Sequence, residues 1–301
     1  MIAPGNHDGV HRGHQALVRT ARAHARGHGL RAVALTFDPH PSVLLAPERA
    51  PTPLTTMARR SELLLAAGAD DVVVQSFTRE FANLPPEDFL QTLRARNARA
   101  LVVGPDFRFG KARAGDVALL RAFGTRHALD VIVEPPVQVG GARVSSSAVR
   151  EAIAQGEVEH ASALLGHVHE LSGHVVEGDH RGRTLGFPTA NLVSEPVLHP
   201  ADGVYAVVVR VLAAESVAPL IRGVANLGVR PTFGAGRSVE VHLFDFSGDL
   251  YGASLRVGFV KRIRPERKFS GLPELRAQIE LDCQAARGTL EAADEGSWAW
   301  I

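Results

Sequence analysis

Residues 5–14 read GNHDGVHRGH, a run of polar and small residues at the point where a strand is expected to give way to a helix. His11 and His14 lie three positions apart, and Gly13 precedes the second histidine. This arrangement aims two imidazoles and the free N–H groups of a helix start at one point, which favours an anionic phosphate. The stretch therefore predicts that the chain handles a nucleoside triphosphate.

Length and composition narrow the class of protein. A chain of 301 residues exceeds what one core usually fills, so we expect two domains. Lys and Arg number 33 against 32 for Asp and Glu, and this balance argues against a nucleic-acid partner. A single cysteine, Cys283, excludes an internal disulfide and a cysteine-based zinc site. The sequence shows no membrane-spanning run and no signal-peptide pattern, so we expect a soluble cytoplasmic enzyme.

Two different patterns divide the chain near residue 168, which predicts domains 1–168 and 169–301. The first half alternates helical signals with short β-rich runs such as 31–37, 71–75 and 100–103, which is typical of a parallel sheet covered on both faces. The second half carries alternating strand-like runs (173–178, 203–212, 223–227, 238–246 and 254–263) and ends in an amphipathic helix over 273–290. This second pattern predicts an antiparallel barrel.

Four polar pieces are expected at the carboxyl ends of the parallel strands, where such sheets bind ligands. They read HRGH at 11–14, TFDPHP at 36–41, GPDFRFG at 104–110 and SSSAVR at 145–150. Each piece alone also fits a capped helix or a simple turn. Those simpler interpretations do not explain why all four appear in this order.

The combination resembles the nucleotidylyltransferase module of the prokaryotic bifunctional riboflavin kinase/FAD synthetase family, and the resemblance runs through essentially the whole chain. It implies a Rossmann-like sheet that transfers AMP from ATP to FMN and gives FAD and pyrophosphate. It implies that His11 and His14 bind the triphosphate and stabilise the developing charge, and that the backbone at Gly13 approaches the ligand closely. It implies that Asp106 lies near the metal and the nucleotide, and that Asp38 and His40 line the flavin-phosphate side. The departing phosphates would be bound by Ser146, Ser147 and Arg150.

The chain departs from the family pattern at two points. His7 stands where the family normally has Phe, and only residues 1–4 precede Gly5. Four residues are few for a central strand. Either the start codon is misassigned or the module has lost its first strand, whose absence would weaken the core.

Residues 180–192, HRGRTLGFPTANL, carry a second phosphate-type motif. Gly182 and Gly186 make a flexible loop that can approach a ligand closely. Thr189 and Asn191 alternate on an extended segment, so their oxygens face one side and suit Mg²⁺. Together with the segments at 202–206, 223–232, 239–243, 249–252 and 264–269, the motif resembles the riboflavin kinase domain, a six-stranded antiparallel barrel with a terminal helix.

Glu240 is our candidate general base. It lies mid-strand between Val239 and Val241, and we expect it to point into the barrel, where burial would raise its pKa. It would take the proton of the ribityl hydroxyl as that oxygen attacks the γ-phosphorus of ATP. The resemblance further suggests that Arg183 and its loop close over nucleotide or flavin, and that Arg267 and Phe269 belong to a flavin-side lid.

The leading hypothesis is a bifunctional enzyme that uses ATP, riboflavin, FMN and Mg²⁺. The alternative is a riboflavin kinase alone, with a degenerate adenylyltransferase domain as scaffold. Two further alternatives are a non-enzymatic flavin-binding protein and nucleotidyl transfer to another phosphorylated acceptor. The chemistry predicts small-molecule partners, with neither nucleic acid nor membrane, and leaves a weak homo-oligomer open.

Overall fold

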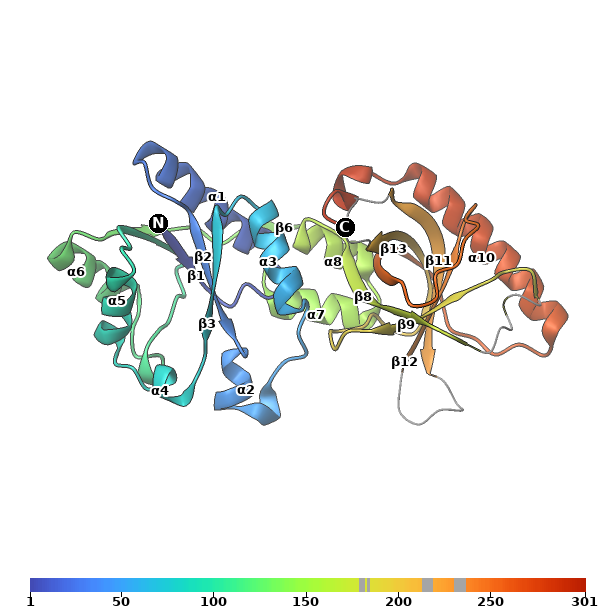
Figure 1. Cartoon of the computed structure of the whole chain (residues 1–301), viewed down its shortest axis with the longest axis horizontal. Helices are drawn as coiled ribbons and strands as arrows, with labels where there is room; N and C mark the ends of the chain where they lie inside the picture. Colours follow the sequence, from blue (N-terminus) through green and yellow to red (C-terminus); the bar gives the residue numbers. More distant parts are fainter. Residues whose placement is uncertain (179–181, 183–184, 213–218, 230–236) are drawn as a thin grey trace. The chain divides into compact units, whose positions relative to one another are not determined.

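The computed structural model describes residues 1–178, 182, 185–212, 219–229 and 237–301 (Figure 1). Within it the chain divides into two compact units, Met1–Ser146 and Ser147–Ile301. Each unit has its own sheet and its own core, and each is described separately below.

The first unit is built on a five-stranded sheet whose order is β3-β2-β1-β4-β5. The strands are β1 (Ile2–Pro4), β2 (Val33–Asp38), β3 (Asp71–Ser76), β4 (Ala100–Val103) and β5 (Asp130–Val133). All four neighbouring pairs are parallel, which confirms the predicted Rossmann-like sheet. The chain reverses its direction of travel across the sheet between β1 and β4, the position at which such sheets bind ligands.

Helices cover both faces of this sheet. Alternate strand residues point to opposite sides, and since both sets are apolar, each face packs against helices. The helical segments of the unit are α1 (Arg12–Gly27), α2 (Pro41–Leu45), η1 (Pro47–Arg49), α3 (Met57–Ala66), α4 (Arg79–Ala82), α5 (Pro86–Ala95), η2 (Lys111–Arg113) and α6 (Val117–His127). Leu101 and Val103 of β4 pack in a core with α5 and α6, whereas Ala100 and Val102 pack with α1. A two-stranded ribbon, β6 (Gln138–Val139) with β7 (Ala142–Arg143), follows β5.

The central strand of the sheet is the short β1. Ile2 pairs with Val33 of β2 on one side and with Leu101 of β4 on the other. A strand therefore occupies the position that the sequence analysis considered lost. Its three residues are buried, and the chain turns directly from it into the histidine motif.

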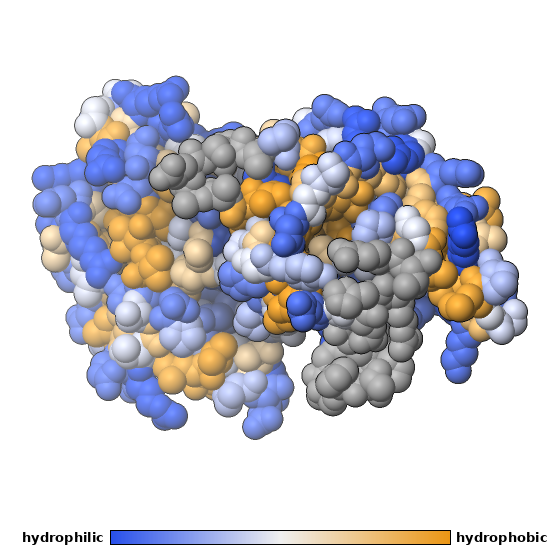
Figure 2. Space-filling view, turned by 45° about the vertical axis from the view of Figure 1, so that its right-hand side comes forward, coloured by the Kyte–Doolittle hydropathy of each residue, from blue (hydrophilic) through white to orange (hydrophobic). Residues whose placement is uncertain are grey.

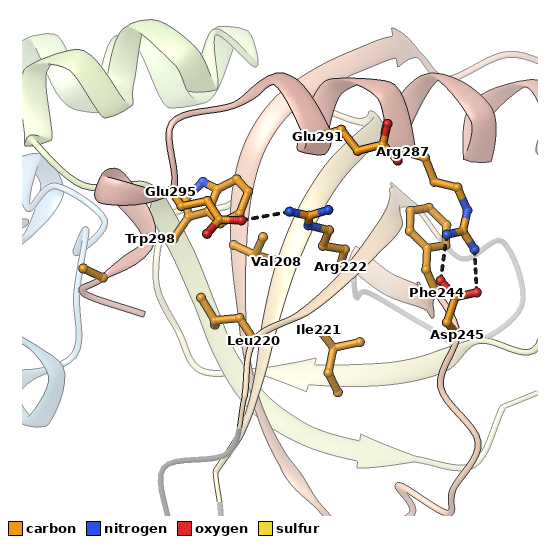
Figure 3. Close-up of a pocket in the computed structure, with 11 residues that line it drawn as sticks. Val208, Leu220, Ile221, Arg222, Phe244, Asp245, Arg287, Glu291, Glu295 and Trp298 are labelled. Atoms are coloured by element: carbon orange, nitrogen blue, oxygen red, sulfur yellow. Dashed lines mark hydrogen bonds and ion pairs between the residues drawn. The ribbon is translucent and has the colours of Figure 1, made fainter.

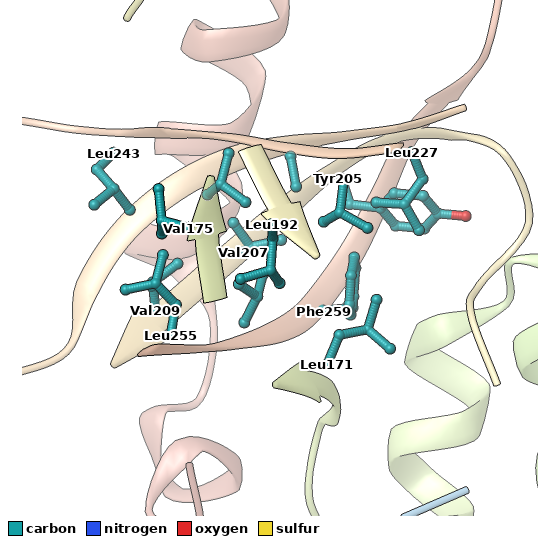
Figure 4. Close-up of a cluster of buried hydrophobic side chains, with 14 of the residues drawn as sticks. Leu171, Val175, Leu192, Tyr205, Val207, Val209, Leu227, Leu243, Leu255 and Phe259 are labelled. Atoms are coloured by element: carbon teal, nitrogen blue, oxygen red, sulfur yellow. The ribbon is translucent and has the colours of Figure 1, made fainter. Parts of the chain in front are cut away.

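The second unit contains a closed antiparallel barrel of order β10-β11-β12-β9-β8-β13, as the resemblance implied. Its segments are α7 (Ser146–Gln155), α8 (Val158–Leu165), β8 (His169–Val176), β9 (Ala190–Ser194), β10 (Gly203–Leu212), β11 (Ile221–Val229), β12 (Arg237–Leu243), β13 (Ser254–Pro265), α10 (Leu272–Ala292) and η3 (Glu295–Trp298). Figure 4 shows side chains such as Leu192, Tyr205 and Phe259 filling the barrel interior.

The terminal helix α10 packs on the outer face of the barrel. Ala286 and Leu290 lie in one cluster with Val204 and Val208 of β10. Cys283 belongs to the same cluster, where burial raises the pKa of its thiol to about 11 and makes it inert as a nucleophile at neutral pH.

No helix among the described residues is long and apolar enough to cross a membrane. On the face shown in Figure 2, hydrophilic residues lie in many places with hydrophobic residues between them.

Candidate functional sites

The histidine motif joins the end of β1 to the start of α1. His11 is the N-cap of α1, and its Nδ1 accepts a hydrogen bond from the backbone N–H of His14 at 3.3 Å. The two imidazole rings stack with their centroids 3.7 Å apart. A Cβ on Gly13 would come within 3.1 Å of the His11 ring, so glycine leaves room for this stack. The structure thus brings His11, Gly13 and His14 together at a helix N-terminus, as predicted.

The imidazole of His14 is neutral at pH 7. Burial lowers the pKa of His14 well below its usual value, and repulsion from His11, His7 and Arg60 lowers it further. A neutral ring in this place acts as a hydrogen-bond donor rather than as a fixed positive charge.

His7 belongs to the same cluster of rings, where it contacts His14. It is fully buried, its Nε2 donates to the carbonyl of Ala3 at 3.0 Å, and its ring meets His14 edge-on at 5.0 Å. Burial lowers the pKa of His7 to about 4, the hydrogen bond to Ala3 acts in the opposite sense, and Arg60 adds to the lowering. The ring of His7 thus behaves as a neutral, core-like side chain.

This lowered pKa predicts a pH-dependent stability. The unfolded chain protonates His7 near 6.5 and the folded chain only near 4, so stability is complete above 6.5 and falls as the pH drops through this window. The loss from this residue reaches roughly 3 kcal/mol at its full extent. Urea unfolding followed by circular dichroism between pH 7 and 4 should show a flatter dependence for His7→Phe. His14 is present in both proteins, so a difference between them reports on His7. Curves of unfolding free energy against pH that run parallel for the two proteins would contradict the lowered pKa of His7.

A buried ion pair fastens this motif to the rest of the first unit, and the sequence analysis did not find it. Arg60 of α3 donates to Asp8 at 3.0 Å and to the carbonyl of Asn6 at 3.0 Å. Asp8 also accepts from the backbone N–H groups of Leu54 and Thr55. Both charges are desolvated, and the backbone N–H groups that donate to Asp8, together with the Asn6 carbonyl that accepts from Arg60, offset part of this cost. The one available signal was Asp8 within the motif, but nothing in the sequence indicated its partner.

Of the other predicted pieces, two approach this loop. His40 lies with its Nε2 3.0 Å from Asn6 Nδ2, and Ser146 donates through Oγ to the carbonyl of Asp8 at 3.0 Å. Asp38 is exposed at the end of β2, and Asp106 is exposed and forms an ion pair with Arg143. Ser147 and Arg150 belong to the second unit, and their place relative to the histidines remains a prediction.

In the second unit, Glu240 and Asn191 face each other directly across β12 and β9. Asn226 of β11 pairs with Glu240 on its other flank. Directly paired residues of antiparallel strands share a face and have Cβ atoms roughly 5 Å apart. One row across the sheet therefore carries Asn191, Glu240 and Asn226. Asn226 had no predicted role, because strand register cannot be read from the sequence.

The predicted inward orientation of Glu240 is wrong. Its neighbours Val239 and Val241 are 1% exposed and belong to the barrel core, so Glu240, which alternates with them, lies on the outer face and is half-buried. The sequence pattern separated the two faces correctly but assigned the interior to the carboxylate. Among the described residues, mostly valine and leucine side chains fill the interior of this small barrel, together with Tyr205 and Phe259 (Figure 4).

Two glycines make room beside the proposed metal ligands. A Cβ on Gly178 would collide with the amide group of Asn191, and one on Gly182 would lie 3.2 Å from Thr189 Oγ1. A hydroxyl and an amide oxygen are hard ligands that suit Mg²⁺ when it keeps waters and binds phosphates. Among the described residues, no group of three or more His, Cys, Asp or Glu could hold a metal ion. Because transition metals favour imidazole and thiolate ligands, the hydroxyl and amide oxygens of Thr189 and Asn191 fit Mg²⁺ better than a transition metal.

The remaining predicted residues are distributed around the barrel. Gly186 has a positive φ of 91°, which glycine adopts without strain, and Arg183 lies outside the described residues. Arg267 lies over the ring of Phe269 at 4.6 Å and pairs with Glu274 at 2.9 Å, so these two residues form one cluster at the start of α10.

One cavity of the second unit is lined by none of the predicted site residues. It has a volume of about 650 Å³ and lies between the end of α10, η3 and the outer face of the barrel (Figure 3). Arg222 pairs with Glu295 at 2.8 Å, and Arg287 pairs with Asp245 at 2.8 Å. Because its cations already have carboxylate partners, its size alone assigns it no ligand. A smaller cavity of about 110 Å³ adjoins Thr189.

Comparison with known proteins agrees with both halves of this description. The chain matches the family model of FAD synthetase over residues 1–148 and that of riboflavin kinase over residues 165–290. It is 42% identical to the bifunctional riboflavin kinase/FMN adenylyltransferase of Escherichia coli K12, over 95% of this chain and 91% of that protein. It is 39% identical to the Bacillus subtilis protein of the same name, with the same coverage. A solved structure from Streptococcus pneumoniae, described as a macrolide-efflux protein, is 33% identical, covers 95% of this chain and 93% of its own, and has a TM-score of 0.86.

Proposed function

The chain belongs to the bifunctional riboflavin kinase/FMN adenylyltransferase family, and from this premise we propose how its own residues serve the two reactions. It phosphorylates riboflavin to FMN and adenylylates FMN to FAD with release of pyrophosphate. Both enzymatic domains are matched, which favours the bifunctional reading over a kinase with a degenerate first domain.

The kinase reaction takes place on the outer face of the barrel. Glu240 accepts the proton of the ribityl terminal hydroxyl while that oxygen forms a bond to the γ-phosphorus of ATP, and the bond between this phosphorus and the β,γ-bridging oxygen breaks to release ADP. Thr189 and Asn191 would hold Mg²⁺, which when bound offsets the charge on the transferring phosphoryl group. Gly182 and Gly186 belong to the loop on the nucleotide side, Arg183 binds the nucleotide, and Arg267 with Phe269 forms the flavin-side lid.

The adenylyl transfer takes place at the carboxyl ends of the parallel strands. The FMN phosphate attacks the α-phosphorus of ATP, and pyrophosphate leaves without a covalent intermediate on the protein. His11, His14 and the N–H groups around Gly13 orient the triphosphate and stabilise the charge that develops. Asp106 serves the nucleotide and its metal, Ser146, Ser147 and Arg150 bind the departing phosphates, and Asp38 and His40 line the flavin-phosphate side.

The observation that carries the kinase assignment is the direct pairing of Asn191 with Glu240. The Asn191 amide fits there because residue 178 is a glycine and has no Cβ to collide with it. Gly178→Ala should push the Asn191 amide aside and lower FMN formation by roughly 10- to 100-fold, the usual effect of disturbing a metal ligand. Flavin chromatography measures the product.

The matched control is Gly288→Ala, at a helical glycine around which a Cβ would meet nothing within 4 Å. This variant should form FMN as the wild type does. Both variants should still convert supplied FMN to FAD, since the first unit is unchanged. Wild-type FMN formation by Gly178→Ala would contradict the metal-ligand role of Asn191.

We further propose that the domain boundary lies near residue 168, after the glycine that ends α8. In this proposal the partners are ATP, riboflavin and FMN, with Mg²⁺ as the metal and without nucleic acid or membrane. The reactions are placed in the cytoplasm, whose reducing conditions suit a chain with one inert thiol. A weak homo-oligomer is compatible with this account.

A further inference from the structure

The segment that carries Thr189 reaches the barrel one residue before strand pairing begins. β9 pairs with β12 through Ala190 and Val241, Asn191 and Glu240, and Leu192 and Val239. One more step of this register would place Thr189 opposite His242. His242 shares the outer face with Glu240, because the two residues are separated by one position on β12. The side chain of His242 therefore lies on the face of β12 that the end of the loop approaches.

His242 makes this connection through a hydrogen bond. Its Nδ1 lies 2.8 Å from the carbonyl oxygen of Pro188, the residue before Thr189. Proline has no N–H, so its carbonyl is its one backbone group able to form a hydrogen bond. A carbonyl only accepts, and Nδ1 of His242 therefore carries the proton.

Aromatic rings fix the orientation of this imidazole. The ring of Phe187 meets His242 edge-on, with centroids 5.6 Å apart and planes at 83°, and the ring of Phe244 meets it at 5.8 Å and 73°. Such T-shaped contacts favour one ring orientation over others. Phe187 belongs to the loop and Phe244 follows β12, so His242 is held between the two segments that it joins.

We propose that His242 is a positioning residue of the kinase site, which holds Pro188 against β12 and so keeps Thr189 beside Asn191 and Glu240. It touches no reacting atom. This inference rests on the roles proposed above for Thr189, Asn191 and Glu240. The position of the loop, however, can be measured without reference to catalysis.

The test compares three substitutions in the full chain. His242→Asn places an amide N–H where the imidazole Nδ1–H lies, His242→Gln places one farther out, and His242→Leu removes the donor. Amide hydrogen exchange over residues 185–191, without ligands, should be roughly fivefold faster for the Leu and Gln variants, as expected for the loss of one hydrogen bond. The Asn variant should exchange as the wild type does.

Kinetics supplies the second readout. For the Leu and Gln variants we expect a rise of roughly fivefold in the KM for ATP in the presence of Mg²⁺, with a smaller change in kcat, and restoration in the Asn variant. Conversion of FMN to FAD should be unchanged in all three. Wild-type exchange and KM in the Leu variant, or an Asn variant that behaves like the Leu variant, would overturn the proposal.

If the Leu variant does not fold, the comparison of Asn with Gln decides the question alone. Should Glu240→Gln leave FMN formation unchanged, the proposed kinase mechanism fails, but the exchange measurement still reports whether His242 fixes the loop. The two failures are therefore distinguishable.

Discussion

Glu240→Gln is expected to slow FMN formation from riboflavin by roughly 100-fold or more, the effect of losing a general base. The amide has the size and hydrogen-bonding reach of the carboxylate but cannot take the ribityl proton. Its place opposite Asn191 should be kept, because strand register and not the side-chain charge sets it. Riboflavin binding, measured by quenching of flavin fluorescence, should therefore be retained. The rate is measured by chromatography of the flavins over time.

The matched control for this substitution is Glu280→Gln, at an exposed carboxylate of α10 that pairs with Arg276. It should leave FMN formation unchanged. Supplied FMN should become FAD at the wild-type rate in both variants. Unchanged FMN formation in Glu240→Gln would remove this residue from the mechanism.

His14→Ala is expected to lower FAD formation from FMN by roughly 100- to 1,000-fold, the usual cost of removing one donor from a site that stabilises developing negative charge. The substitution also removes the ring against which His11 stacks at 3.7 Å, so the triphosphate loses a donor and the orientation of a second one. FMN formation from riboflavin should be intact, because that reaction belongs to the second unit.

The control for this prediction is His28→Ala, at the exposed C-cap of α1, which should leave both reactions unchanged. Circular dichroism at pH 7 checks that the first unit of His14→Ala is folded. An equal loss of both reactions in a folded variant would contradict two separate sites.

Much of the fold could be predicted because local signals agree with the global structure. The runs at 100–103 and 203–212 are mostly apolar and rich in valine, and they form β4 and β10 over those same residues. The helix predicted over 273–290 is α10, one or two residues longer at each end. β1 was not predicted, because three residues are too few to show a periodic pattern. Its pairing with β2 and β4 on both sides stabilises this short strand.

The sites could be predicted in composition but not in geometry. His11, Gly13 and His14 lie within one helical turn, so their proximity in space can be predicted from their spacing in the sequence. The partnership of Asp8 with Arg60 and the row of Asn191, Glu240 and Asn226 depend on residues far apart in the chain. The error at Glu240 has the same origin, since alternation separates two faces of a strand but does not say which face is the interior.

The most direct test of one chain with two sites is the flavin content of a reaction that contains the purified wild-type protein, riboflavin, ATP and Mg²⁺. Chromatography over time should show FMN rising first and FAD following it, and FMN supplied in place of riboflavin should give FAD and pyrophosphate. A reaction that yields no FMN would contradict the kinase site in the barrel, and one that leaves supplied FMN unchanged would contradict the adenylyl transfer site at the histidines.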